Sequence, residues 1–113
     1  MKNILKKKEF LELLAKSYTP KKRKLLVEWG GPAAIHALSE IALNTLKGNI
    51  KLTPALFKKI KKCRNILRAL SNKKYSQSKK KHLITQHGGM FLPYLLPAVL
   101  GAIPGLISAL KKK

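Results

Sequence analysis

The side chains of this sequence that are able to do chemistry are mainly cations. Of its 113 residues, 25 are Lys or Arg and four are Asp or Glu, which gives a formal net charge of +21 (25 − 4). The four acids are Glu9, Glu12, Glu28 and Glu40, so the chain has no carboxylate side chain after position 40. A charge balance of this kind predicts a partner rich in negative charge, either nucleic acid or an anionic membrane.

Sets of residues that could form a catalytic or metal site do not occur in the sequence. His36, His82 and His87 are scattered and have no Cys or carboxylate at metal-ligand spacing. The single cysteine, Cys63, excludes an intramolecular disulfide and falls on an apolar stripe, so we expect it to be a small buried side chain. Because no Ser–His–acid set, Cys–His pair or phosphate-binding glycine loop is present, we expect no enzyme activity, no metal and no cofactor.

Three basic segments are the predicted sites of phosphate contact. Lys and Arg neutralise phosphates and release counterions, which drives binding to nucleic acid whatever its sequence. The chain has 22 Lys and three Arg, and this excess of Lys favours point-charge contacts over bidentate recognition of bases. The predicted contact residues are Lys21, Lys22, Arg23 and Lys24; Lys58, Lys59, Lys61, Lys62, Arg64 and Arg68; and Lys73, Lys74, Lys79, Lys80 and Lys81.

The first basic segment has a second interpretation. Pro20-Lys21-Lys22-Arg23-Lys24 is similar to a monopartite nuclear import signal. Cations in the first turn of a helix are unfavourable, because the amino end of a helix carries a partial positive charge. We therefore expect the segment to serve a partner rather than the stability of its helix.

Proline and glycine predict where the helices that carry these cations begin and end. Thr19-Pro20 and Thr53-Pro54 each combine an N-cap residue with a proline suited to the first helical turn. The helix that starts at Pro20 is expected to stop at Gly30-Gly31, and the next, from Pro32, to stop at Gly48. A further helix is expected over about 3–17, and Trp29 is expected to anchor the helical core.

The helix predicted from Pro54 to about position 71 has the clearest pattern. Its apolar residues recur at steps of four, three, four and three, so one stripe faces the core while Lys and Arg cover most of the remaining surface. The stripe consists of Leu56, Ile60, Cys63, Leu67 and Leu70.

The sequence thus predicts an all-α protein, a small bundle of three to four short helices followed by a tail. We expect a basic helical domain over 1–71, a basic connector over 72–87 and a hydrophobic segment, rich in Pro and Gly, over 88–113. Met90 to Leu110 carry no charge and would span a bilayer as one helix, although Pro93, Pro97 and Pro104 interrupt it. The segment is also suited to lie in a membrane interface, to dock on the other helices or to self-associate.

The order of Gly and Pro in this tail resembles the C-terminal segment of the adenovirus core protein X precursor, the source of the mu peptide. Homologues of that protein are also described in Polinton and adintovirus elements. The resemblance covers about a quarter of the chain, and the basic part precedes the apolar part in both. The matching pieces are Gly88-Gly89, Leu92-Pro93, Leu96-Pro97 and Gly101-Ala102-Ile103-Pro104-Gly105.

The resemblance implies a virion core protein that condenses double-stranded DNA, with a viral protease site at Gly88-Gly89. Two features differ: the basic part is rich in Lys rather than Arg and His, and Gln86 stands where the protease motif prefers Met, Ile or Leu.

We therefore expect a non-enzymatic DNA-condensing protein of the virion and the host nucleus. Its tail is expected to contact capsid or other virion proteins, a membrane, or further copies of the chain. The alternative is a membrane-active or membrane-anchored minor virion protein that acts through residues 90–110. A helical scaffold that binds an acidic protein is a third hypothesis.

Overall fold

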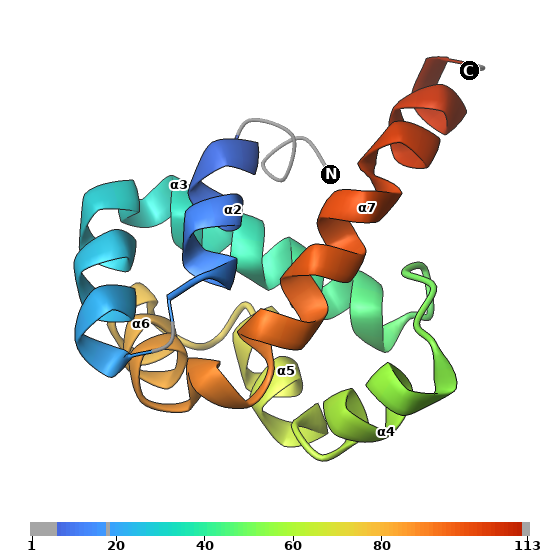
Figure 1. Ribbon diagram of the computed structural model, residues 1–113. Coiled ribbons are helices and arrows are strands. Elements are labelled where there is room, and N and C mark those ends of the chain that lie inside the picture. Colours follow the sequence, from blue (N-terminus) through green and yellow to red (C-terminus); the bar gives the residue numbers. More distant parts are fainter. Residues whose placement is uncertain (1–6, 18, 112–113) are drawn as a thin grey trace.

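A computed structural model describes residues 7–17 and 19–111 of the chain, with side chains described up to residue 101 (Figure 1). In this part all regular structure is helical, which confirms the all-α prediction. The expected number of three to four helices is wrong, because the described residues form six α-helices and one short 3-10 helix. These are α2 (Lys8–Ala15), α3 (Pro20–Leu46), α4 (Pro54–Lys61), α5 (Arg64–Ser71), α6 (Gln77–His87), η1 (Gly88–Met90) and α7 (Leu92–Lys111).

Hydroxyl side chains cap the amino ends of three helices. The Oγ1 of Thr19 accepts a hydrogen bond from the backbone N–H of Lys22, and the Oγ1 of Thr53 accepts one from Leu56. Proline follows each threonine, so both Thr-Pro predictions are confirmed. Ser76 caps α6 in the same way.

Two glycines in the left-handed backbone region bend and end α3. Gly31 has a φ of 68° and, together with Pro32, kinks the helix where the sequence predicted one helix to stop and another to start. Gly48 has a φ of 76°, and its N–H bonds to the carbonyl of Thr45 while that of Asn49 bonds to Asn44. This pair of bonds is the Schellman motif, which satisfies the last carbonyls of the helix.

The helix expected over 54–71 is interrupted at Lys62 and Cys63. Its apolar stripe is nevertheless correct, since Ile60, Cys63, Leu67 and Leu70 are buried. The break allows α4 to pack against α7 and α5 to pack against α3. One straight helix over these residues would not pack against both α7 and α3, so tertiary packing overrides the local helical pattern here.

One hydrophobic core joins all parts of the described chain. α3 runs through the middle and packs against α5 and α6, while α2 packs against the first turns of α7 (Figure 1). The last turns of α7 project beyond the other helices (Figure 1). Fully buried core residues come from helices far apart in the sequence, among them Leu11, Ile41, Leu67, Ile84 and Leu96.

The residues of the expected connector and tail are part of the helical fold, and the first half of the tail follows the alternative of docking on the other helices. Residues 77–87 of the predicted connector form α6, whose Ile84 is fully buried. In the predicted tail, Phe91, Leu92, Leu95, Leu96 and Val99 are buried in the same core as the amino-terminal helices. The first half of the hydrophobic segment therefore completes the core instead of following it.

Trp29 is not a core residue, contrary to the prediction, and 75% of its surface is exposed. On the first half of α3, Arg23 and Val27 lie one helical turn apart and occupy the buried face. Trp29 follows Val27 by two residues, which places it about 200° further around the helix, on the outer side.

On the buried face of α3, Arg23 has only 3% of its surface exposed. Its Nε and Nη2 atoms donate hydrogen bonds to the carbonyl of Thr85, at 3.3 and 3.2 Å, and Nη1 donates to the carbonyl of Ser17 at 3.4 Å. Thr85 lies in the last turn of α6, where the helix dipole favours a cation. Arg23 therefore joins α3 to the end of α6 and to the chain that follows α2.

Gly88 and Gly89 provide the space that the Arg23 side chain needs. A Cβ atom on Gly88 would lie 2.7 Å from Cδ1 of Leu92 and 2.8 Å from Cδ of Arg23. On Gly89 it would lie 3.2 Å from the nearest guanidinium nitrogen, which is a much milder contact.

We predict that Gly88→Ala destabilises the fold by about 2 kcal/mol, because both neighbouring side chains are buried and have no room to move. Gly89→Ala is the matched control and should change the free energy of unfolding by less than about 0.5 kcal/mol. Urea unfolding followed by circular dichroism measures both values. Equal stabilities of the two variants would contradict this account of Gly88.

Candidate nucleic-acid interface

Of the fifteen predicted phosphate contacts, twelve are exposed in the structure, one is partly exposed and two are buried. Arg23 and Lys80 are 3% and 7% exposed, so both are withdrawn as direct contacts. Lys81 is partly exposed, and its Nζ forms an ion pair of 3.1 Å with Glu28. The exposed residues are Lys21, Lys22, Lys24, Lys58, Lys59, Lys61, Lys62, Arg64, Arg68, Lys73, Lys74 and Lys79.

Helices α4 and α5 and the turn that follows them carry the densest group of exposed cations. The group, called here the basic face, consists of Lys58, Lys59, Lys61, Lys62, Arg64, Arg68, Lys73 and Lys74. Lys59 is held in place by Tyr94 of α7, since its Nζ lies 4.0 Å from the centre of the tyrosine ring. The segments that form this face contain no Asp or Glu to neutralise its cations, because every acid of the chain precedes position 41.

The structure adds two cations that the sequence argument did not select. Lys47 and Lys51 are exposed in the segment that joins α3 to α4, next to Leu46 and Leu52 respectively. Leu46, Leu52, Lys61 and Arg64 line one hollow, so this segment borders the basic face. Lys47 and Lys51 are isolated in the sequence, and only the return of the chain beside α4 brings them near the other cations.

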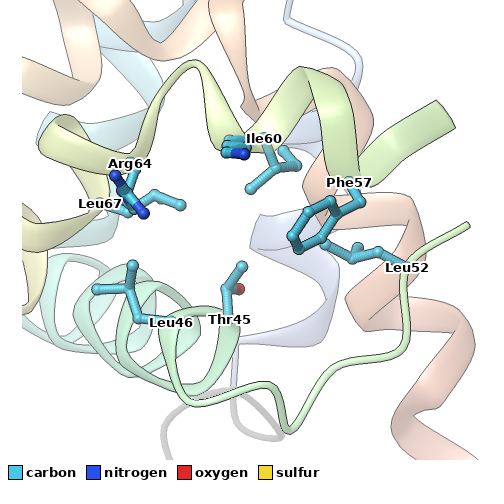
Figure 2. Close-up of a pocket in the computed structure, with 8 residues that line it drawn as sticks. Thr45, Leu46, Leu52, Phe57, Ile60, Arg64 and Leu67 are labelled. Atoms are coloured by element: carbon cyan, nitrogen blue, oxygen red, sulfur yellow. The ribbon is translucent and has the colours of Figure 1, made fainter. Parts of the chain in front are cut away.

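An apolar hollow of about 200 Å³ opens within the basic face. Figure 2 shows Phe57 and Leu52 on one side of it and Arg64 and Leu67 on the other. Phe57 is 57% exposed at the edge of the hollow. The hydroxyl of Thr45, which also lines it, already donates to the carbonyl of Ile41. Phosphates would therefore meet the cations at the rim rather than the apolar floor.

Lys80 lies inside the fold because α6 packs against α3. Its Nζ donates a hydrogen bond of 3.2 Å to the Oγ of Ser39 on α3. Burial removes water from the ammonium group and lowers the pKa of Lys80 from its ordinary value of 10.5. The fold thus carries a desolvation cost at neutral pH, which decreases as the pH rises toward 10.5 and the lysine loses its proton.

Gly88 and Gly89 are located between α6 and α7, within η1. Gly88 is buried and Gly89 is exposed, and both Phe91, which follows η1, and Leu92, which begins α7, are buried. Cleavage after Gly89 stays a prediction. The contacts of Arg23 give this glycine pair a role in packing that does not depend on a protease.

The described residues contain no group of three or more His, Cys, Asp or Glu side chains able to hold a metal ion. Cys63 is 2% exposed, and its Sγ lies 3.8 Å from the carbonyl oxygen of Lys59 and 3.7 Å from that of Met90. Burial raises the pKa of its thiol, which keeps it protonated and poorly reactive.

Comparison with known proteins identifies no matching family model, no similar curated protein and no similar solved structure. Within the part of the chain whose side chains the structure describes, up to position 101, no helical stretch is long and apolar enough to cross a membrane.

Lys79 and Lys80 are adjacent in sequence, one exposed and one buried, and allow a matched test. We predict that Lys80→Met stabilises the protein by about 1 kcal/mol at pH 7, because it removes a desolvated charge. This gain should shrink as the pH approaches 10.5. Lys79→Met should leave stability almost unchanged. Thermal unfolding of both variants between neutral and alkaline pH measures the difference, and a destabilised Lys80→Met variant would show that the bond to Ser39 outweighs desolvation.

Proposed function

We propose that this protein binds and condenses double-stranded DNA without sequence specificity, as a non-enzymatic core protein of a virion. The observation that carries the proposal is the basic face on α4, α5 and the following turn, in a chain with no acid after position 40. The resemblance of the Gly- and Pro-containing tail to the adenovirus protein X segment supports the same function. It also supports the virion and the host nucleus as the places where the protein acts.

The dimensions of the basic face suit a duplex. Each of α4 and α5 has eight residues and is about 12 Å long. Duplex DNA carries one phosphate for every ~1.7 Å of its axis, so one such helix lies opposite about seven phosphates. If about six cations of the face each neutralise one phosphate, the slope of log K against log salt concentration is about −5.

Condensation requires one protein molecule to touch more than one segment of DNA. Lys21, Lys22 and Lys24 form a second exposed cationic group at the start of α3. The start of α3 and α4 lie on different sides of the molecule (Figure 1). Two separated cationic groups are suited to bridge two duplexes, which reduces their mutual repulsion.

The alternative function, a membrane protein that acts through residues 90–110, has less support. Phe91, Leu92, Leu95, Leu96 and Val99 are buried in the core and are not available to lipid, which leaves Met90 and Tyr94 as the exposed large apolar side chains of that half of the segment. The burial of these residues favours the DNA-binding function.

Two variants that remove the same charge test whether the basic face is the DNA site. Lys58→Gln with Lys62→Gln removes two cations from the face. Lys8→Gln with Lys16→Gln removes two exposed cations from α2 and its end. We predict that the first pair makes the salt slope less steep by about 2 and that the second pair leaves it nearly unchanged. Fluorescence anisotropy with a random-sequence duplex measures both slopes.

Two results would contradict the proposal. Binding of the unmodified protein that does not change between ~50 and ~200 mM salt would exclude phosphate neutralisation as the driving force. Equal effects of the two variant pairs would mean that the net charge, and not the basic face, determines binding. Light scattering of long DNA mixed with the protein tests condensation separately.

A further inference from the structure

Three large apolar side chains are exposed together on α2 and the first half of α3. Trp29 is 75% exposed, Leu25 is 59% exposed and Leu13 is 51% exposed. Leu13 and Leu25 line the same hollow, of about 360 Å³, and Trp29 follows Leu25 by one helical turn. The Trp29 ring lies beside that of Phe10, with 6.5 Å between their centroids.

Lysines line one part of the border of this group, which is called here the Trp29 face and comprises Leu13, Leu25 and Trp29, and the exposed Glu9 precedes Leu13 by one helical turn. Lys16 and Lys22 line the hollow with the two leucines. Lys21 is exposed and precedes Leu25 by one helical turn, so Lys21, Leu25 and Trp29 share one side of α3. Exposed apolar groups with a polar rim of this kind are interaction sites more often than accidents of folding.

We propose that the Trp29 face docks on the surface of an anionic lipid bilayer. Trp29, Leu25 and Leu13 enter the boundary between headgroups and acyl chains, where tryptophan is favoured. Lys16, Lys21 and Lys22 contact the acidic headgroups, and the long lysine side chains let the apolar groups go deeper than the charges. This function goes beyond DNA binding and leaves the basic face free, but it uses Lys21 and Lys22 of the second cationic group, so lipid and a second duplex would compete for these two lysines.

Lipid fits the Trp29 face better than DNA does. Two of the three exposed groups are aliphatic and offer a base no flat surface for stacking. Among the described residues that line the hollow, only Ser17 has a hydroxyl, and it already donates to the carbonyl of Leu14, so these residues present no free hydroxyl to a base edge. The cations on its rim match acidic headgroups, and its floor matches hydrocarbon.

Trp29 is the single tryptophan of the chain and therefore reports on its own face. In the test, the full-length protein is titrated with vesicles of phosphatidylcholine and phosphatidylserine while tryptophan emission is recorded. We expect the emission to shift to shorter wavelength as the exposed indole leaves water. Vesicles of phosphatidylcholine alone should produce a much weaker shift, because the lysines then have no acidic headgroups to contact.

The variant Leu13→Ser with Leu25→Ser keeps the tryptophan as the reporter and removes its apolar neighbours. Both leucines are largely exposed, so folding should be preserved, which circular dichroism verifies. We expect vesicle affinity to fall by at least about tenfold. Phe57→Ser is the matched control, since Phe57 is 57% exposed on α4, and it should bind vesicles like the unmodified protein.

Three results would overturn the proposal. The first is an emission spectrum that anionic vesicles leave unchanged. The second is that the double serine variant still binds vesicles whereas a chain truncated after residue 101 does not. This result would assign the lipid contact to the tail. The third is a change in tryptophan emission that duplex DNA causes and vesicles do not cause. This change would have to be absent in the double serine variant. DNA affinity measured through the basic-face variants stays an independent result, so failure here is distinguishable from failure of the DNA-binding proposal.

Discussion

The burial of the Arg23 guanidinium is the interaction on which the arrangement of the helices depends. A buried cation is tolerated only when its N–H groups are satisfied, and here the carbonyls of Thr85 and Ser17 accept from it. Those carbonyls lie at the end of α6 and after α2, while Arg23 itself lies near the start of α3. Three helix ends must therefore meet around one side chain. The close approach of this side chain to Gly88 then determines where α7 can begin.

Charge is the second constraint on this protein. Four carboxylates can neutralise at most four of 25 cations, so folding must separate many like charges while it buries an apolar core. The helices meet this requirement by placing almost all cations on the outside. α4 and α5 expose their lysines and arginines and bury one apolar stripe. A bound polyanion would reduce the repulsion between cations that opposes folding. The stability of this fold is therefore linked to the proposed binding of DNA.

The distribution of surface groups gives the molecule two distinct regions. The basic face lies on α4, α5 and the following turn, around the hollow beside Phe57. The Trp29 face lies on α2 and the first half of α3, where apolar side chains are exposed between lysines. A protein with this arrangement is suited to the two proposed interactions, with DNA on one side and a bilayer on another.

The sequence by itself determined the features that arise locally. Thr-Pro pairs and glycines marked helix ends, and the apolar stripe predicted from Leu56 to Leu70 identified a face that is buried from Ile60 onward. The anionic partner that the missing acids indicate stays a prediction. Only the tertiary structure decided which side each remaining residue faces. Arg23 is buried because the carbonyls of the nearby Ser17 and of the distant Thr85 accept its hydrogen bonds, and Trp29 is exposed because the opposite side of α3 packs on the core. Composition and spacing describe one helix at a time, whereas burial depends on the surfaces that other helices bring to it.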